Sequence, residues 1–484
     1  MQGLGFEIWI GFFAVLAIIA VVGILSARRV KTAQDYSLAG RKMGPVLVSA
    51  SLVGTFVGGT SIVGTAQASF FYGISGIWFT LGAGLSCLFM AIFLAKPLRN
   101  SGVETIPELL EQGYNRRTGL WANAYTSIGI FIQIAAQTLA AIPLMGALFS
   151  LNPPQAALAV TVLILCYVVF GGFVGATWIG LIKMTLLYFS MAVAVIVLLR
   201  NAGGTGLFLE NFSYHPWFNL LAQGAAKELG SGVSVLIGFA STQSYLQALF
   251  AGRDASAARR GALIAAAFIP LVGLGSVLIG MFMRLYHPWI NPADAMPLFI
   301  LEYISPWLAG IILATLLISL IMTASGLTLG LSTMFNRDFY RNIIRPRAGD
   351  RELILVFRLT IIFIVALAFL FTLGNIHALI LKLAFLSMAL RGVAVFLPIL
   401  GVLFWKNIIP PEDGKRAVIY APAASLLWAL FLPNVLDPLY IGLVISFILL
   451  FGRSLRQKMQ RQEMTRGRFS CHLIEVSPIQ NKSS

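Results

Sequence analysis

The chain has 484 residues, of which 58% are hydrophobic and 11% are charged, and its formal net charge is +16. Its mean hydropathy is +0.87, which excludes an ordinary soluble domain and a disordered chain. Repeated apolar runs of about 20 residues are long enough to cross a lipid bilayer. The three cysteines lie too far apart in the sequence for a metal or redox motif.

The apolar runs predict an all-α polytopic membrane protein with about thirteen transmembrane helices. The predicted spans are 5–26, 44–72, 74–95, 119–149, 155–171, 177–199, 229–250, 261–284, 305–335, 353–373, 376–405, 417–434 and 437–452. The first run has no basic segment before it and no cleavage pattern after it, so we expect a retained helix. An odd number of spans places the termini on opposite sides of the membrane.

Lysine and arginine residues concentrate in alternate loops. They gather in 27–43, 96–117, 253–260, 337–351, 406–416 and the tail after 452, whereas the opposite loops carry Arg200, Lys227 and Arg284. Because cytoplasmic loops are enriched in positive charge, this pattern predicts an outside N-terminus and a cytoplasmic C-terminus in the cytoplasmic (inner) membrane. The charge thus reflects topology, and we expect no nucleic-acid partner.

The stretch from Gly54 to Thr65 (GTFVGGTSIVGT) lies inside the second apolar run and carries four glycines and four hydroxyl side chains. Glycine favours unwinding, and hydroxyls compete for backbone carbonyls. Broken helices near the bilayer midplane hold substrate and ion sites in secondary transporters. A helix-packing face of small residues is the alternative interpretation.

Several ordered segments resemble the sodium:solute symporter family, which includes choline, proline, pantothenate and glucose symporters. The segment 35–45 (DYSLAGRKMGP) is similar to the approach to that family's core, and 56–59 (FVGG), 64–66 (GTA) and 95–99 (AKPLR) resemble its choline-transporter-like branch. Further matches follow at 171–178, 243–247 and 322–340. Together they extend the resemblance from residue 35 to residue 340.

The resemblance implies a leucine-transporter-like core of five-plus-five helices in inverted repeats. The repeats would be 44–199 and 229–405, with a peripheral first helix and cytoplasmic loop at 1–43, two peripheral helices at 406–452 and a basic cytoplasmic tail at 453–484. The family also has thirteen spans and an outside N-terminus, in agreement with the hydropathy pattern. Rocking of one repeat against the other around a midplane site gives alternating access.

The resemblance also implies a sodium site made of backbone carbonyls from Gly54, Val57 and Ser319 and the hydroxyl of Thr323. Oxygen ligands of this kind suit a hard cation. The adjacent hydroxyl position is Met322, a poor sodium ligand, so Ser325 or a water would have to complete the site.

A second departure from the family pattern lies in the sixth span. The family's Thr-Asp pair and the glutamine three residues later read Ile179, Gly180 and Lys183 here. By analogy with sodium-independent transporters of the same broad fold, Lys183 is a candidate to replace the ion, as a proton carrier or a fixed charge. A lysine that extends to the cytoplasmic end of its span is the alternative.

For the solute, the resemblance indicates side chains of the broken second span and of the seventh. The candidates are Phe56, Thr60, Ser61, Gln243, Tyr245 and Gln247, together with Gln133 and Gln137, one turn apart on the fourth span. The choline-branch tryptophan position is Thr242, so we do not expect choline. Each polar candidate could instead serve interhelical hydrogen bonding.

Arg391 lies in the middle of the eleventh span, with Lys382 nearer its outer end. Intramembrane cations without intramembrane carboxylates suggest an anionic solute, such as a small carboxylate. The alternative is that Arg391 binds helix carbonyls.

These observations predict a secondary active transporter performing cation-coupled symport, with sodium as the family expectation, of a small polar or anionic organic solute. One alternative is a proton-coupled or sodium-independent transporter with Lys183 in place of the ion. Another is a solute sensor, although sensing relatives carry signalling domains longer than 453–484. No catalytic motif points to an enzyme, and no cofactor or metal beyond sodium is expected. The expected partners are the solute and the lipid bilayer, and the sequence does not determine the oligomeric state.

Overall fold

The computed structural model of the chain describes residues 5–27, 41–103, 105–171, 176–405, 408–432 and 437–453. Within these residues the structure is helical, with one isolated parallel bridge between Met43 and Gly252. The predicted all-α class is therefore confirmed. The tail from 454, the loop 28–40 with most of its motif, and residues 172–175 lie outside the described residues.

The elements of the first half follow one another in the order predicted from hydropathy. They are α1 (Phe6–Ala27), α3 (Pro45–Phe56), η2 (Thr60–Gly64), α4 (Thr65–Tyr72), η3 (Gly73–Ile77), α5 (Trp78–Phe89), η4 (Met90–Leu94), α6 (Ala95–Asn100), α7 (Ile106–Gly113), α8 (Arg116–Phe149), α9 (Pro153–Gly171), α10 (Ala176–Asn201), α11 (Gly206–Asn211) and α12 (Tyr214–Trp217).

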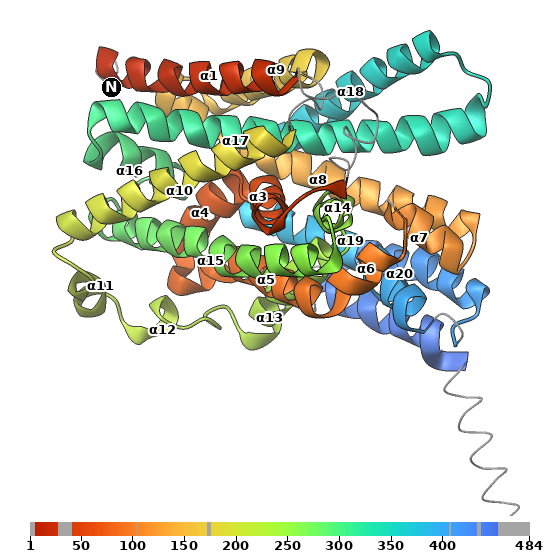
Figure 1. The fold of residues 1–484 in the computed structure, drawn as a ribbon. Helices are drawn as coiled ribbons and strands as arrows, with labels where there is room; N and C mark the ends of the chain where they lie inside the picture. Colours follow the sequence, from red (N-terminus) through yellow and green to blue (C-terminus); the bar gives the residue numbers. More distant parts are fainter. Residues whose placement is uncertain are drawn as a thin grey trace, which may run out of the picture.

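The second half begins with another interrupted helix. Its elements are α13 (Ala225–Phe239), α14 (Gln243–Phe250), α15 (Ala255–Tyr286), η5 (Pro292–Asp294), α16 (Ala295–Tyr303), α17 (Pro306–Met334), η6 (Phe335–Ile344), α18 (Asp350–Leu373), α19 (Ile380–Phe404), α20 (Pro411–Phe431) and the helix Pro438–Arg453. Figure 1 shows the long helices running side by side, with α11 and α12 at one end of the bundle and α7 at the other.

Two polar side chains start long helices at the end of the bundle predicted to be cytoplasmic. Asn115 Oδ1 accepts a hydrogen bond from Thr118 N at 2.9 Å and begins α8, and Asp254 Oδ1 accepts one from Ala257 N at 2.7 Å and begins α15. Such caps satisfy N–H groups that have no partner within the helix. The hydrogen bond from Ala257 also lowers the pKa of the Asp254 carboxyl.

Helices lie in all the predicted spans, but they differ in length. Among the described residues, seven helices are long and apolar enough to cross a membrane by length and composition, or eight if the bent pair α13 and α14 forms one span. The shorter apolar helices are Phe6–Ile19, Pro45–Phe56, Pro153–Val168 and Pro438–Arg453. Pro45–Phe56 is short because the second predicted span is broken after it. The count of thirteen spans stays a prediction.

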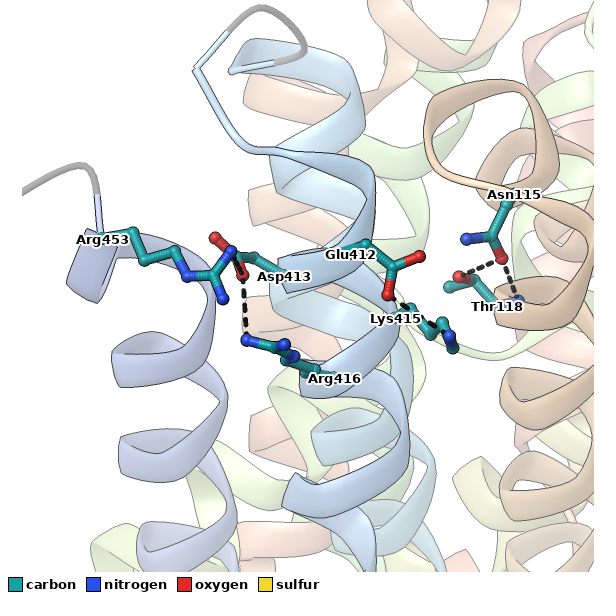
Figure 2. Close-up of polar contacts among 7 residues, drawn as sticks. All are labelled: Asn115, Thr118, Glu412, Asp413, Lys415, Arg416 and Arg453. Atoms are coloured by element: carbon teal, nitrogen blue, oxygen red, sulfur yellow. Dashed lines mark hydrogen bonds and ion pairs between the residues drawn. The ribbon is translucent and has the colours of Figure 1, made fainter.

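Asp413 joins α20 to the last described helix. Its side chain is 2% exposed, and Oδ1 lies 3.3 Å from Arg453 Nη1 and 3.9 Å from Arg416 Nη1. Figure 2 shows the carboxyl group between these two arginines, one from each helix, beside the Lys415–Glu412 pair and the Asn115 cap. A buried carboxylate needs such partners, so this contact fixes the two helices to each other.

The site described next lies where α8 packs against α17 and α19. Glycines permit the close contacts there. A Cβ at Gly129 of α8 would lie 2.6 Å from Arg391 Cγ, and one at Gly238 of α13 would lie 2.3 Å from the carbonyl oxygen of Met388. Both distances are shorter than real Cβ contacts, so α19 can approach both helices only where these residues lack a side chain.

Candidate ion and solute site

The helix is broken within the Gly54–Thr65 stretch, as predicted. α3 ends at Phe56, Val57 is extended (φ −73°, ψ 103°), and helical structure resumes at Gly59. Ser61 stabilises the break, because its Oγ accepts a hydrogen bond from Gly58 N at 2.9 Å and donates one to Gly58 O at 2.8 Å. The hydroxyl predicted to contact solute therefore satisfies the interrupted backbone.

The ammonium group of Lys183 lies at the end of α3, just before this break. Its Nζ donates hydrogen bonds to Gly54 O at 2.7 Å and to Thr323 Oγ1 at 2.9 Å, and the side chain is buried. A Cβ at Gly54 would lie 3.2 Å from the carbonyl oxygen of Gly180, so α10 packs closely against α3 at Gly54. Lys183 thus points into the protein and contacts two of the predicted sodium ligands.

The other predicted ion ligands form a chain of hydrogen bonds along α17. Ser319 Oγ donates to Val57 O at 3.2 Å, and Thr323 Oγ1 donates to Ser319 O at 2.8 Å. Ser325 Oγ is buried and has no hydrogen-bond partner among the described residues. Gly54, Val57, Ser319 and Thr323 are therefore brought together.

Three of the predicted solute residues form one polar cluster. Gln137 Nε2 donates to Thr60 Oγ1 at 3.1 Å, Thr60 N donates to Gln137 Oε1 at 3.4 Å, and Gln133 Nε2 lies 3.4 Å from Thr60 Oγ1. All three side chains are buried. Because Thr60 follows the break and both glutamines lie on α8, the cluster connects the broken helix to α8.

A second break separates α13 from α14 and bends the pair by 51°. Thr242 is extended there (φ −102°, ψ 123°), and its Oγ1 accepts a hydrogen bond from Arg391 Nη1 at 3.0 Å. Arg391 Nη2 lies 3.5 Å from Gln133 Oε1, so the arginine of α19 contacts both the second break and the polar cluster.

Aromatic side chains next to the two breaks pack against one another. Phe56 stacks on Phe79 with a centroid separation of 5.0 Å, and Tyr245 stacks on Phe239 at 4.0 Å. The rings of Phe56 and Tyr245 are 6.0 Å apart. Two of the predicted solute residues thus belong to one group of packed rings that connects the two breaks.

Other predicted residues are placed elsewhere. Gln243 Oε1 accepts a hydrogen bond from Ile106 N at 2.8 Å, which ties α14 to the start of α7. Gln247 is half-buried one turn further along α14. Lys382 is exposed in the first turn of α19, and its role as an intramembrane cation stays a prediction.

A family model, Sodium:solute symporter family, matches residues 36–410. The chain belongs to this family. It is similar in structure to a Na⁺-coupled sialic acid symporter in a substrate-bound outward-open state, with a TM-score of 0.73, 17% identity, and coverage of 93% of this chain and 98% of the other. It is also similar to a nucleobase-cation-symport-1 family transporter in a closed conformation with bromovinylhydantoin bound, with a TM-score of 0.59, 12% identity, and coverage of 88% and 95%.

Membership of the sodium:solute symporter family makes the chain a membrane transport protein with a leucine-transporter-like fold, and it supports cation-coupled symport of a small solute. No group of three or more His, Cys, Asp or Glu side chains in the described residues could hold a metal ion.

A cavity of about 560 Å³ in this family member lies toward the end of the molecule predicted to be outside. Gln67, Pro143, Asn291, Asp294 and His377 are among the residues that line it. Burial raises the pKa of the Asp294 carboxyl from 3.8 to about 6. The cavity places the side chains of Asp294 and His377 at the end of the molecule predicted to be outside.

Gln67 is a site residue that the sequence reasoning missed. It is buried, lines the cavity, and accepts a hydrogen bond through Oε1 from Ile380 N at 2.9 Å. This contact joins α4 to the first turn of α19, whose N–H groups lack helical partners. Gln67 follows Thr60 by seven residues, and this helical spacing could have identified it from the sequence.

Proposed function

We propose that the chain is a secondary active transporter that moves a small polar or anionic organic solute by alternating access, with the ammonium group of Lys183 in place of a sodium ion. The observation that carries the proposal is the position of Nζ, 2.7 Å from Gly54 O and 2.9 Å from Thr323 Oγ1. Both oxygens belong to the set that the family resemblance assigns to sodium.

Electrostatics supports replacement rather than joint occupancy. An ammonium group and a sodium ion carry the same charge and bind the same carbonyl and hydroxyl oxygens. A sodium ion held by these oxygens would lie about 4 Å from Nζ, where two like charges repel by about 4 kcal/mol at an effective dielectric constant of about 20. We therefore assign the cation site to the protein's own side chain.

Two substitutions relative to the family pattern support the same assignment. Met322 removes a hydroxyl ligand, and Gly180 removes the acidic side chain that would favour a bound cation. Gly54 leaves room for the backbone of α10 at Gly180, which brings Lys183 into contact. A site that supplies its own positive charge needs neither group.

The contact can control the motion of the two halves. We assign 44–199 and 229–405 as the repeats; each begins with an interrupted helix, α3–α4 and α13–α14. Lys183 and Gly54 lie in the first repeat and Thr323 lies in the second, so rocking of one half against the other has to break or rebuild the hydrogen bond from Lys183 Nζ to Thr323 Oγ1. A permanently charged lysine gives uncoupled exchange, whereas a lysine that loses its proton gives proton-coupled transport.

We also propose the cytoplasmic membrane as the location, with the N-terminus outside and the C-terminus inside. The end of the bundle with α7 carries the predicted cytoplasmic arginines at the start of α8, and α11 and α12 lie at the opposite end (Figure 1). The positive-inside rule supports this orientation.

The test is solute counterflow in proteoliposomes, with a library of neutral and anionic solutes and with either sodium or potassium at equal concentration on both sides. We expect saturable exchange of at least one solute at the same rate in both salts. Exchange only in sodium contradicts the assignment of Lys183, and absence of exchange with any solute indicates a sensor. A pH series then separates proton-coupled from uncoupled transport.

A further inference from the structure

Arg391 is the largest fully buried side chain of the described residues, with 0% exposure. It lies on α19, near the middle of a 25-residue helix, and Gly129 of α8 leaves space for its Cγ and Cδ atoms. An arginine at this depth is costly in a membrane protein and is usually retained because it binds something.

One edge of the guanidinium group is held by its own helix. Arg391 Nε donates to Ser387 O at 3.1 Å, and Nη2 lies 2.9 Å from Ser387 Oγ and 3.2 Å from Met388 Sδ. Ser387 Oγ in turn donates to Gly129 O at 2.5 Å. These contacts fix the orientation of the guanidinium plane.

The other edge, formed by Nη1 and Nη2, faces the two elements around the predicted solute site. Nη1 donates to Thr242 Oγ1 at 3.0 Å, at the α13–α14 break, and Nη2 reaches Gln133 Oε1 at 3.5 Å, a weak contact. This edge has the geometry that binds a carboxylate through two parallel hydrogen bonds.

The hydrogen-bond partners of Arg391 among the described residues are all neutral, so its charge is not compensated. The buried acidic side chains of the described residues are Glu228 and Asp413, and each is engaged elsewhere, Glu228 with Gln223 and Asp413 with two arginines. A buried charge without a counter-charge is strongly unfavourable. An anion at the Nη1–Nη2 edge would supply the missing charge.

Further hydrogen-bonding capacity remains at the same break. Ser241 Oγ and Ser244 Oγ, on either side of Thr242, are buried and have no hydrogen-bond partner among the described residues. Buried hydroxyls are normally satisfied, so two such groups together indicate a place for a polar ligand. The aromatic side chain of Tyr245 lies close enough to interact with the guanidinium group.

We propose that Arg391 recognises a carboxylate group of the transported solute. The carboxylate displaces Thr242 Oγ1 and Gln133 Oε1 from the Nη1–Nη2 edge and takes two hydrogen bonds there, and the remainder of the solute lies against Phe56 and Tyr245. The released Thr242 and Gln133, with Ser241, can then bind other polar groups of the solute. This inference rests on the proposed function, because it names the chemical class of solute for the same site.

The test uses the purified full-length protein and matched probes that differ only in charge: acetate and acetamide, hexanoate and hexanamide, benzoate and benzamide. Thermal unfolding is measured against the concentration of each probe, because a ligand that binds the native state stabilises it. We expect at least one carboxylate to stabilise the wild type and its amide to bind roughly tenfold to a hundredfold more weakly, the contribution of hydrogen bonds to a charged group. Arg391→Gln should reduce carboxylate affinity by a similar factor, and Arg391→Lys should give an intermediate loss.

The wild-type comparison does not depend on whether the variants fold. Equal binding of amide and carboxylate, or no stabilisation by any carboxylate of the panel, overturns the assignment of Arg391. Counterflow reports separately on the proposed function: a protein that exchanges a neutral solute in sodium and in potassium, but is not inhibited by any carboxylate, retains the proposed function and refutes this inference.

Discussion

Replacing Lys183 by alanine should convert a sodium-indifferent protein into one that binds sodium. The substitution removes the two hydrogen bonds from Nζ to Gly54 O and Thr323 Oγ1, at 2.7 and 2.9 Å, and leaves these oxygens facing the vacated space. The carbonyls of Val57 and Ser319 lie in the same hydrogen-bonded chain, since they accept from Ser319 Oγ and Thr323 Oγ1. A sodium ion can then occupy the position of the ammonium group.

The two lost hydrogen bonds are worth about 1.5–3 kcal/mol each, because the donor is charged. Relief of the buried ammonium's desolvation returns several kcal/mol, so stability in potassium should change little. In sodium at a hundredfold excess over Kd, the alanine variant should gain about 2.7 kcal/mol, and the wild type should gain nothing.

The assay is thermal unfolding at constant ionic strength, with potassium replaced stepwise by sodium. Lys183→Met is the matched control, because its apolar side chain fills the space without supplying a charge or admitting an ion. Adding Met322→Ser to Lys183→Ala completes the oxygen ligands and should increase the effect of sodium. Stabilisation of the wild type by sodium, or an alanine variant that is indifferent to it, would refute the reasoning.

Three further predictions concern other parts of the molecule. The raised pKa of Asp294 contributes stability that is fully present below about pH 4 and is lost as the pH rises through about 6. Asp294→Asn should therefore flatten the dependence of thermal stability on pH and stabilise the protein at pH 7, also in a His377→Gln background. An unchanged pH dependence would contradict the burial of this carboxyl. Gln67→Leu removes the hydrogen bond to Ile380 N that holds α4 to the start of α19, so a cysteine-reactive probe should reach a cysteine introduced at Leu139, which lines the cavity, faster than in the parent. Equal rates would show that this hydrogen bond does not limit access to the cavity. Asp413→Ala should lower the free energy of unfolding by about 1.5–3 kcal/mol through loss of its arginine contacts, and Asp413→Glu, which keeps the charge, should lose less.

The sequence located the broken helix because glycine and hydroxyl residues change backbone preferences locally. It therefore predicted the interruption near Val57 and the approach of Thr60, Gln133 and Gln137, which lie on faces set by helical periodicity. It also identified Lys183 as an unusual intramembrane cation. The direction in which the Lys183 side chain points followed only from the structure, because the same side chain could extend to the cytoplasmic surface or turn toward Gly54.

Other features depend on contacts between distant segments, which helical periodicity does not encode. The sequence predicts Gln243 as a solute residue, and it does not predict the hydrogen bond that its Oε1 accepts from Ile106 N. The Ser61 hydroxyl pairs with the N–H and the carbonyl of Gly58, because the break leaves these backbone groups without helical partners. Gln67 of α4 and Asp294 of η5 line the same cavity. No pattern in either segment alone predicts that the two segments lie close together.

Solute uptake into proteoliposomes with and without an inward sodium gradient, at fixed membrane potential and pH, tests the central claim most directly. If Lys183 takes the place of the ion, a solute found by counterflow should equilibrate at the same rate and to the same level under both conditions. Accumulation above equilibrium that requires the sodium gradient would show that sodium still drives transport, and that the contact of Lys183 with Gly54 and Thr323 does not replace it.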